Sequence, residues 1–151
     1  MSMLTLDQAR TISVGAFARA AELDLDPLTV AVLDAGGHLR LLERADGSGI
    51  LRPQIAIGKA WGALGLGLPS RELERRSEGR PTFFGALASA SDGRVVPAAG
   101  AVLVLSDDEI VGAVGVTGDT ADNDEQCALA GVEAAGFLAD ATSDKVRRSA
   151  L

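Results

Sequence analysis

The pattern of apolar and polar positions predicts that the first half of the chain forms a helix, a β-hairpin and a second helix. Residues 5–8 (Thr-Leu-Asp-Gln) have the form of a capping box, and small or aliphatic residues then recur at helical spacing towards Pro27. Two apolar segments flank a Gly-Gly turn, at Val30–Leu33 and Leu39–Glu43, as is typical of a hairpin. Pro53 suits the first turn of a helix that we expect to run to about Leu66.

The second half of the chain begins with segments that the pattern assigns less clearly. We expect Ser70 to cap a short charged helix that ends near Arg76. Residues 78–100 show neither helical nor strand periodicity, so we expect a mostly irregular stretch in which Phe83-Phe84 forms a buried anchor.

A second hairpin and a last helix complete the pattern. Ala101–Leu105 and Ile110–Val116 are apolar strands around a tight turn at residues 106–108, and a helix is predicted from Gly118 to about Ala139. Residues from Thr142 onward are polar and are expected to fray. This order of elements predicts an α+β fold, in which residues 1–140 form one domain and 141–151 a polar C-terminal tail.

Composition and charge narrow the classes of partner. The net charge of −7 argues against nucleic acid, whose phosphates need clustered Lys and Arg. No run of about 20 apolar residues suggests a membrane span, and the first residues lack the basic-then-apolar pattern of a signal peptide. A single cysteine, Cys127, excludes an internal disulfide and is interpreted as a small core residue. We therefore expect a cytoplasmic protein with no nucleic-acid or membrane partner.

Six segments resemble the GlcG/HbpS-like family, also called the haem-degrading-domain family, which includes domains like the PduO C-terminal domain. The resemblance covers about Leu4 to Ala139 and implies a profilin-like antiparallel sheet of about five strands, packed helices and a homo-oligomer. It also implies a small-molecule ligand, with haem as one possible cofactor, and a role accessory to a catabolic or biosynthetic pathway. The segments are VAVLDAGGHL, ERADG, IAIGKA, VPAAGAVLVL, EIVGAVGVTG and DNDEQCALAG.

Lys59 is the first candidate for binding a ligand. Its predicted helix is apolar nearly all round, and a buried ammonium group there needs an anionic partner. That partner is either an internal carboxylate, such as Glu43 or Asp34, or the carboxylate or propionate of a ligand. Arg44 is a further candidate for holding an anion.

Other candidates surround the two hairpins. His38 is the only histidine and could act as a general base or an iron ligand, or it could be an exposed residue beside a turn. No second His or Cys lies at a metal-binding spacing from His38, so no metal site is predicted. The possible ligands of a haem iron are His38, Cys127, Met1 and Met3.

The start of the last helix also carries candidates. Glu125 stands at the end of an apolar stripe that continues along the last helix at helical spacing, and it is our candidate acid or base. Asp119, Asp122 and Asp124 are explained by the helix dipole. Backbone N–H groups near Thr117 could hold an anion, and Gly100 could let a ligand approach the backbone.

Two functions remain open from the sequence. The first is a small-molecule-binding protein whose ligand is haem or bears a carboxylate. The alternative is a cofactor-independent acid/base enzyme acting on a small carboxylate or carbonyl compound. In that case Lys59 or Arg44 would hold the anion, and His38, Glu43 or Glu125 would move a proton.

Overall fold

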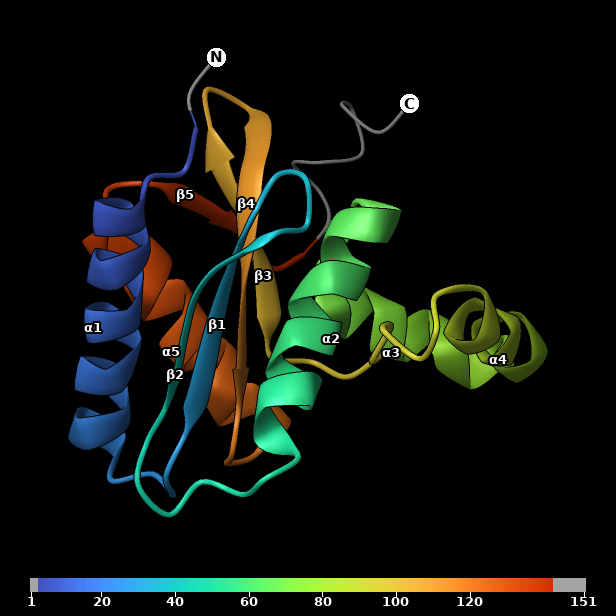
Figure 1. Ribbon diagram of the computed structural model, residues 1–151, viewed down its shortest axis with the longest axis horizontal. Helices are drawn as coiled ribbons and strands as arrows, with labels where there is room; N and C mark the ends of the chain where they lie inside the picture. The colour runs from blue at the N-terminus through green and yellow to red at the C-terminus, as the bar shows by residue number, and fades with distance from the viewer. Residues whose placement is uncertain (1–2, 143–151) are drawn as a thin grey trace.

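A five-stranded antiparallel sheet with helices on both faces organises the computed structural model, which describes residues 3–142 (Figure 1). The strand order is β2-β1-β4-β3-β5, and every neighbouring pair is antiparallel. This confirms the predicted α+β class and the sheet of about five strands. The strands are β1 (Thr29–Asp34), β2 (Leu39–Arg44), β3 (Ala101–Ser106), β4 (Glu109–Thr117) and β5 (Leu138–Asp140).

The helices form two layers and a projecting arm (Figure 1). On one face lie α1 (Leu6–Leu23) and α5 (Ala121–Ala134), which enclose an aliphatic core with the sheet. The other face is covered by α2 (Arg52–Leu66), whose small side chains pack on β1, β3 and β4. We call α3 (Ser70–Gly79) and α4 (Pro81–Ala90) the arm, because together they extend away from the α2 side of the sheet.

Local signals explain why the main elements begin and pack where they do. The capping box at Thr5 is present, with its hydroxyl accepting from the backbone N–H of Gln8. The approach of α2 to the sheet depends on Gly115, where an added Cβ would lie 2.1 Å from the carbonyl oxygen of Ala56. The missing side chain at Gly115 thus lets α2 lie directly against β4.

The stretch 78–100 is more ordered than the sequence predicted. It contains α4, which begins at Pro81. Of the predicted anchor Phe83-Phe84, Phe84 is buried and Phe83 is exposed. The expected cap at Ser70 is also wrong, because Pro69 occupies the N-cap position. The Ser70 hydroxyl instead accepts from the backbone N–H of Ala101 at 2.8 Å, which fixes the base of the arm to β3.

The last helix is shorter than predicted. It ends at Ala134, and Gly136 then adopts a φ of +80°, which turns the chain back towards the sheet. Residues 138–140 form β5 beside β3, where the sequence predicted a continuing helix. The predicted fraying of the tail from residue 143 onward lies outside the described residues.

The arm carries an ion-pair network that should give stability a distinct acid dependence. Hydrogen bonds from Arg75 and Arg76 lower the pKa of Glu72 to about 2, from an ordinary value of 4.5. Because the folded pKa is the lower one, the network stabilises the fold above about pH 4.5 and loses this effect as the pH falls towards 2. We expect Glu72→Gln to cost about 1 kcal/mol at neutral pH, since the arginines are largely exposed, and nothing near pH 2.

Urea unfolding of the wild type, Glu72→Gln and the control Glu78→Gln, at about pH 7 and about pH 2, measures this difference. Glu78 is exposed in the same helix. An equal cost of Glu72→Gln at both pH values would show that the carboxylate charge does not stabilise the arm.

Candidate functional site

A buried lysine connects the two layers of the molecule at one end of the sheet. The side chain of Lys59 leaves α2 and is only 5% exposed. Its Nζ donates to the carbonyl oxygen of Val116 at 3.0 Å and lies 3.5 Å from Oδ2 of Asp124, at the start of α5. The side chain passes close to Gly100, where an added Cβ would lie 2.7 Å from the lysine Nζ. Gly100 therefore provides the space through which α2 reaches α5.

The counter-ion of Lys59 is Asp124, and the predicted partners Glu43 and Asp34 were wrong. Burial lowers the pKa of Lys59 and raises the pKa of Asp124, while their mutual attraction opposes both shifts. Asp124 also accepts from the backbone N–H of Asp119 at 2.9 Å. The helix-dipole explanation of Asp124 is thus incomplete, because this carboxylate is buried and neutralises a specific ammonium group.

A row of polar side chains crosses the same end of the sheet on the α2 face. Arg44, Thr29 and Thr117 are register partners on β2, β1 and β4, so they stand side by side on one face. Arg52 reaches this row from α2 and donates to the Thr117 hydroxyl at 2.8 Å. Ser48 completes it, since its hydroxyl lies 2.8 Å from that of Thr29 and its carbonyl accepts from Arg44. We call these five residues the arginine row.

The arginine row carries positive charge without a matching carboxylate. Within residues 3–142, neither Arg44 nor Arg52 has an acidic oxygen within 4.0 Å. Arg52 is half-buried, and its charge is close enough to contribute to the lowered pKa of Lys59, after the larger effect of burial. A half-buried guanidinium with unused donors is a site to which a carboxylate can bind through two hydrogen bonds.

Arg52 was not identified as a candidate from the sequence, although its spacing from Lys59 places the two side chains together. It precedes Lys59 by seven residues, which is two helical turns, so both side chains leave the same face of α2. Asp124 had a similar signal, because Cys127, Ala128 and Val132 follow it at helical spacing and all three are buried.

The structure gathers only some of the residues that the sequence proposed as one site. Lys59, Gly100, Thr117 and Arg44 meet at the arginine-row end of the sheet. The other four candidates lie elsewhere, and each has a structural partner of its own: Asp34, His38, Glu43 and Glu125.

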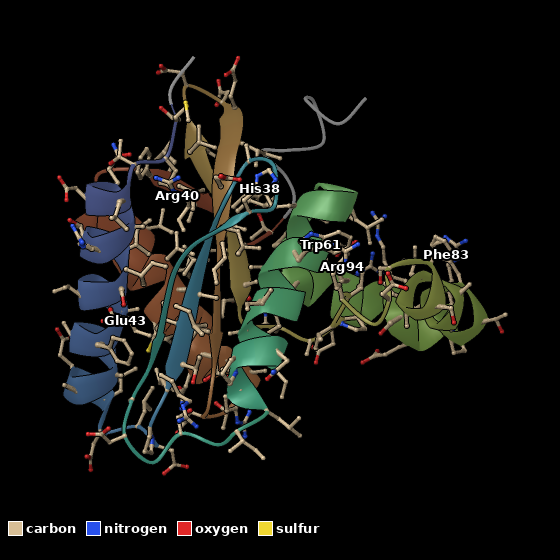
Figure 2. The ribbon with its side chains drawn as sticks, viewed as in Figure 1. His38, Arg40, Glu43, Trp61, Phe83 and Arg94 are labelled. Atoms are coloured by element: carbon tan, nitrogen blue, oxygen red, sulfur yellow. The ribbon has the colours of Figure 1, made fainter. Side chains whose placement is uncertain are left out.

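His38 and Asp34 lie at the turn of the β1–β2 hairpin, five residues along the strands from the arginine row (Figure 2). The His38 ring is 80% exposed and contacts Asp34, whose carboxylate also accepts from the backbone of Gly36 and His38. These hydrogen bonds help to lower the pKa of Asp34, although burial opposes them. This pair therefore stabilises the turn at the end opposite the arginine row.

Glu43 and Glu125 are likewise engaged away from the arginine row. Glu43 points to the α1 face, where it accepts from the Ser13 hydroxyl at 2.5 Å (Figure 2). Glu125 accepts from Arg71 of the arm at 2.9 Å. Both carboxylates connect elements of the fold.

The part of the chain that the structure describes contains neither a metal-binding cluster nor a reactive thiol. Among residues 3–142, no cluster of three His, Cys, Asp or Glu side chains could hold a metal ion. Cys127 is fully buried, and burial raises the pKa of its thiol to about 11. No helix within this range is long and apolar enough to cross a membrane.

The fold and the arginine row together define a small α+β domain that gathers uncompensated positive charge at one end of its sheet. A family model described as "Haem degrading protein HbpS-like" matches residues 4–133, and the chain belongs to that family. This confirms the resemblance drawn from the sequence segments.

Individual relatives agree with this assignment. An uncharacterized 15.0 kDa protein in the dhaT-dhaS intergenic region of Citrobacter freundii is 27% identical over 124 residues, which cover 82% of this chain and 86% of the relative. The crystal structure of HbpS matches with a TM-score of 0.76 and 28% identity, over 88% of this chain and 90% of that one. The crystal structure of a PduOC:heme complex has a TM-score of 0.81 at 24% identity, over 90% of this chain and 97% of that one. At that identity, the last likeness speaks to the fold alone.

Proposed function

We propose that this chain binds a small molecule through a carboxylate group held at the arginine row, and that it is accessory to a catabolic or biosynthetic pathway. The observation that carries the proposal is Arg52, a half-buried guanidinium that is hydrogen-bonded to Thr117 and has no acidic partner within the described residues. A charge in such a position is normally paired, so an anionic ligand is the simplest partner. The family description, which refers to haem, supports a ligand-binding role.

The row offers a ligand both charge and directional hydrogen bonds. Arg52 and Arg44 supply guanidinium donors, and the hydroxyl groups of Thr117, Thr29 and Ser48 lie between them. Lys59 is occupied by Val116 and Asp124, so its part is to hold the end of β4 in place. The arrangement binds and orients an anion.

The described residues do not form a haem-iron site within one chain. His38 is exposed at the hairpin turn, Cys127 is buried in the core, and Met3 is exposed near the N-terminus; Met1 lies outside the described residues. These donors lie on different parts of the fold, so they offer no converging pair of axial ligands. A carboxylate-bearing ligand fits the residues better than iron ligation does.

A thermal-shift screen with acetate, succinate and citrate, and with a matched sulfonate series, tests the proposed function. A ligand at 100 times its Kd stabilises the folded state by about 2.7 kcal/mol, which is a shift of several degrees for a domain of this size. We expect at least one carboxylate to raise the Tm of the wild type and to raise it less in Arg52→Gln. Equal shifts in both proteins would place the binding site elsewhere.

Haem gives a separate prediction. We expect weak haem binding or none, because the only histidine stands on an exposed turn without a second ligand. If any haem binding is specific, its affinity should fall sharply in His38→Ala. Titration of haem, followed through the Soret band, measures this. Tight binding with an unchanged spectrum in His38→Ala would show that another residue ligates the iron.

A further inference from the structure

The turn that leads into α2 exposes two large apolar side chains beside the arginine row. Residues 49–52 form this turn, in which the backbone N–H of Arg52 donates to the carbonyl oxygen of Gly49 at 3.1 Å. Ile50 and Leu51 occupy its two central positions, where they are 85% and 68% exposed. Such positions are usually taken by Gly, Pro, Asn, Asp or Ser. We call residues 49–52 the apolar turn, because it places aliphatic surface where a turn normally has polar or small residues.

The apolar turn is fixed to the arginine row by contacts on both of its sides. Ser48, which precedes it, is hydrogen-bonded to both Thr29 and Arg44. An added Cβ at Gly49 would lie 3.8 Å from Cγ of Arg52, so the turn packs on the stem of that arginine. The turn lies at the end of the sheet opposite the β1–β2 turn (Figure 1). The two exposed apolar side chains therefore border the arginine row as an ordered part of the fold.

The surroundings of the arginine row offer a ligand one charged side and one apolar side. Lys59, the nearest other cation, already contacts Val116 and Asp124. The first turn of α2 contains no acidic residue, and Leu51 takes the N-cap position without a side-chain cap. A second anionic group on a ligand would meet apolar side chains instead of a free cation, and a charge placed there would lose hydration without a partner.

We propose that the ligand of the arginine row is an amphiphilic carboxylate, whose anionic head is held by the row and whose aliphatic body lies on Ile50 and Leu51. This inference rests on the proposed function and adds the chemical class of the ligand to it. Covering the two side chains removes apolar surface from water, so each methylene group that reaches the apolar turn should tighten binding. A small hydrophilic acid such as citrate would leave both side chains exposed.

Calorimetric titration of the wild type with acetate, butyrate and hexanoate, at one ionic strength, tests the class of ligand. We expect the affinity to rise along the series and hexanoate to bind at least ~10-fold more tightly than acetate. 1-Hexanol has a similar body without the carboxylate, and it should bind at least ~10-fold more weakly than hexanoate. Equal affinities for acetate and hexanoate would overturn the inference.

The double variant Ile50→Ser/Leu51→Ser tests the place at which the body binds. Both side chains are exposed, so we expect the Tm to stay close to that of the wild type. Hexanoate should bind at least ~10-fold more weakly, and acetate within about twofold of the wild type. Leu39→Ser is the matched control, because Leu39 is an exposed leucine near the β1–β2 turn and its loss should leave hexanoate binding unchanged. If the double variant does not fold, Ile50→Ser alone takes its place. Unchanged hexanoate binding in the folded variant would contradict the proposal.

Arg52→Gln separates a failure of this inference from a failure of the proposed function. We expect it to weaken the binding of acetate and of hexanoate by similar factors, because both use the same head group. If acetate and hexanoate bind equally well and both depend on Arg52, the proposed function stands and the amphiphilic class is wrong. Hexanoate binding that is unchanged in Arg52→Gln would contradict both.

Discussion

Replacing Lys59 with methionine is expected to lower the free energy of unfolding by about 3–5 kcal/mol. Methionine keeps most of the apolar stem but leaves Asp124, which is 2% exposed, without its counter-ion. The backbone oxygen of Val116 also loses its donor. Urea unfolding followed by circular dichroism measures the effect. The deficit should shrink as the pH falls, because burial already raises the pKa of Asp124 and protonation neutralises it.

The double variant Lys59→Met/Asp124→Asn provides the matched control. Asparagine removes the stranded charge and keeps an oxygen that can accept from the backbone N–H of Asp119. We expect it to recover at least half of the lost stability, as is found when both members of a buried ion pair are replaced. If Lys59→Met alone stays within about 1 kcal/mol of the wild type, the pair contributes little and Lys59 is free to serve a ligand.

Gly100→Ala is expected to cost about 2–3 kcal/mol, because it combines a strained backbone with a collision. Gly100 has a φ of +132°, and an added Cβ would lie 2.6 Å from the carbonyl oxygen of Val116. That carbonyl also accepts from Lys59, so the substitution should disturb the lysine together with the strand ends. The Tm of the variant and the rise in Tm that the carboxylate causes are measured together. Both should be smaller than in the wild type.

Gly65→Ala is the control for this substitution. Gly65 lies in α2 with nothing within 4 Å of the added Cβ, so alanine should be neutral or stabilise the helix by up to about 1 kcal/mol. If Gly100→Ala is as stable as the wild type, the close passage of Lys59 beside β3 is not tightly packed, and Gly100 has no structural role there.

The sequence predicted the fold well where patterns are long and local. The capping box at Thr5, the two hairpins and the apolar helix after Pro53 each depend on neighbouring residues, and all were found. β5 is only three residues long and exists because it pairs with β3, so its own sequence carries no periodic signal. α4 was missed because it has an apolar composition without a helical stripe.

The candidate site was harder to predict because its residues come together only through strand register and layer crossing. Arg44 and Thr117 are 73 positions apart, yet both are register partners of Thr29. Glu43 is adjacent to Arg44 in sequence, but alternation along the strand turns it to the opposite face. The ion pair of Lys59 with Asp124 crosses the end of the sheet, which no sequence spacing reveals.

Calorimetric titration of three proteins tests the central claim, that an anion is held at the arginine row, most directly. The titrant is the carboxylate that gives the largest thermal shift, and the proteins are the wild type, Arg52→Gln and Arg40→Gln. Arg40 is an exposed arginine near the other end of the same hairpin, so its loss changes the net charge equally. We predict at least ~10-fold weaker binding in Arg52→Gln, equivalent to ~1.4 kcal/mol, and binding within about twofold of the wild type in Arg40→Gln. Equal affinity in all three proteins would contradict the account.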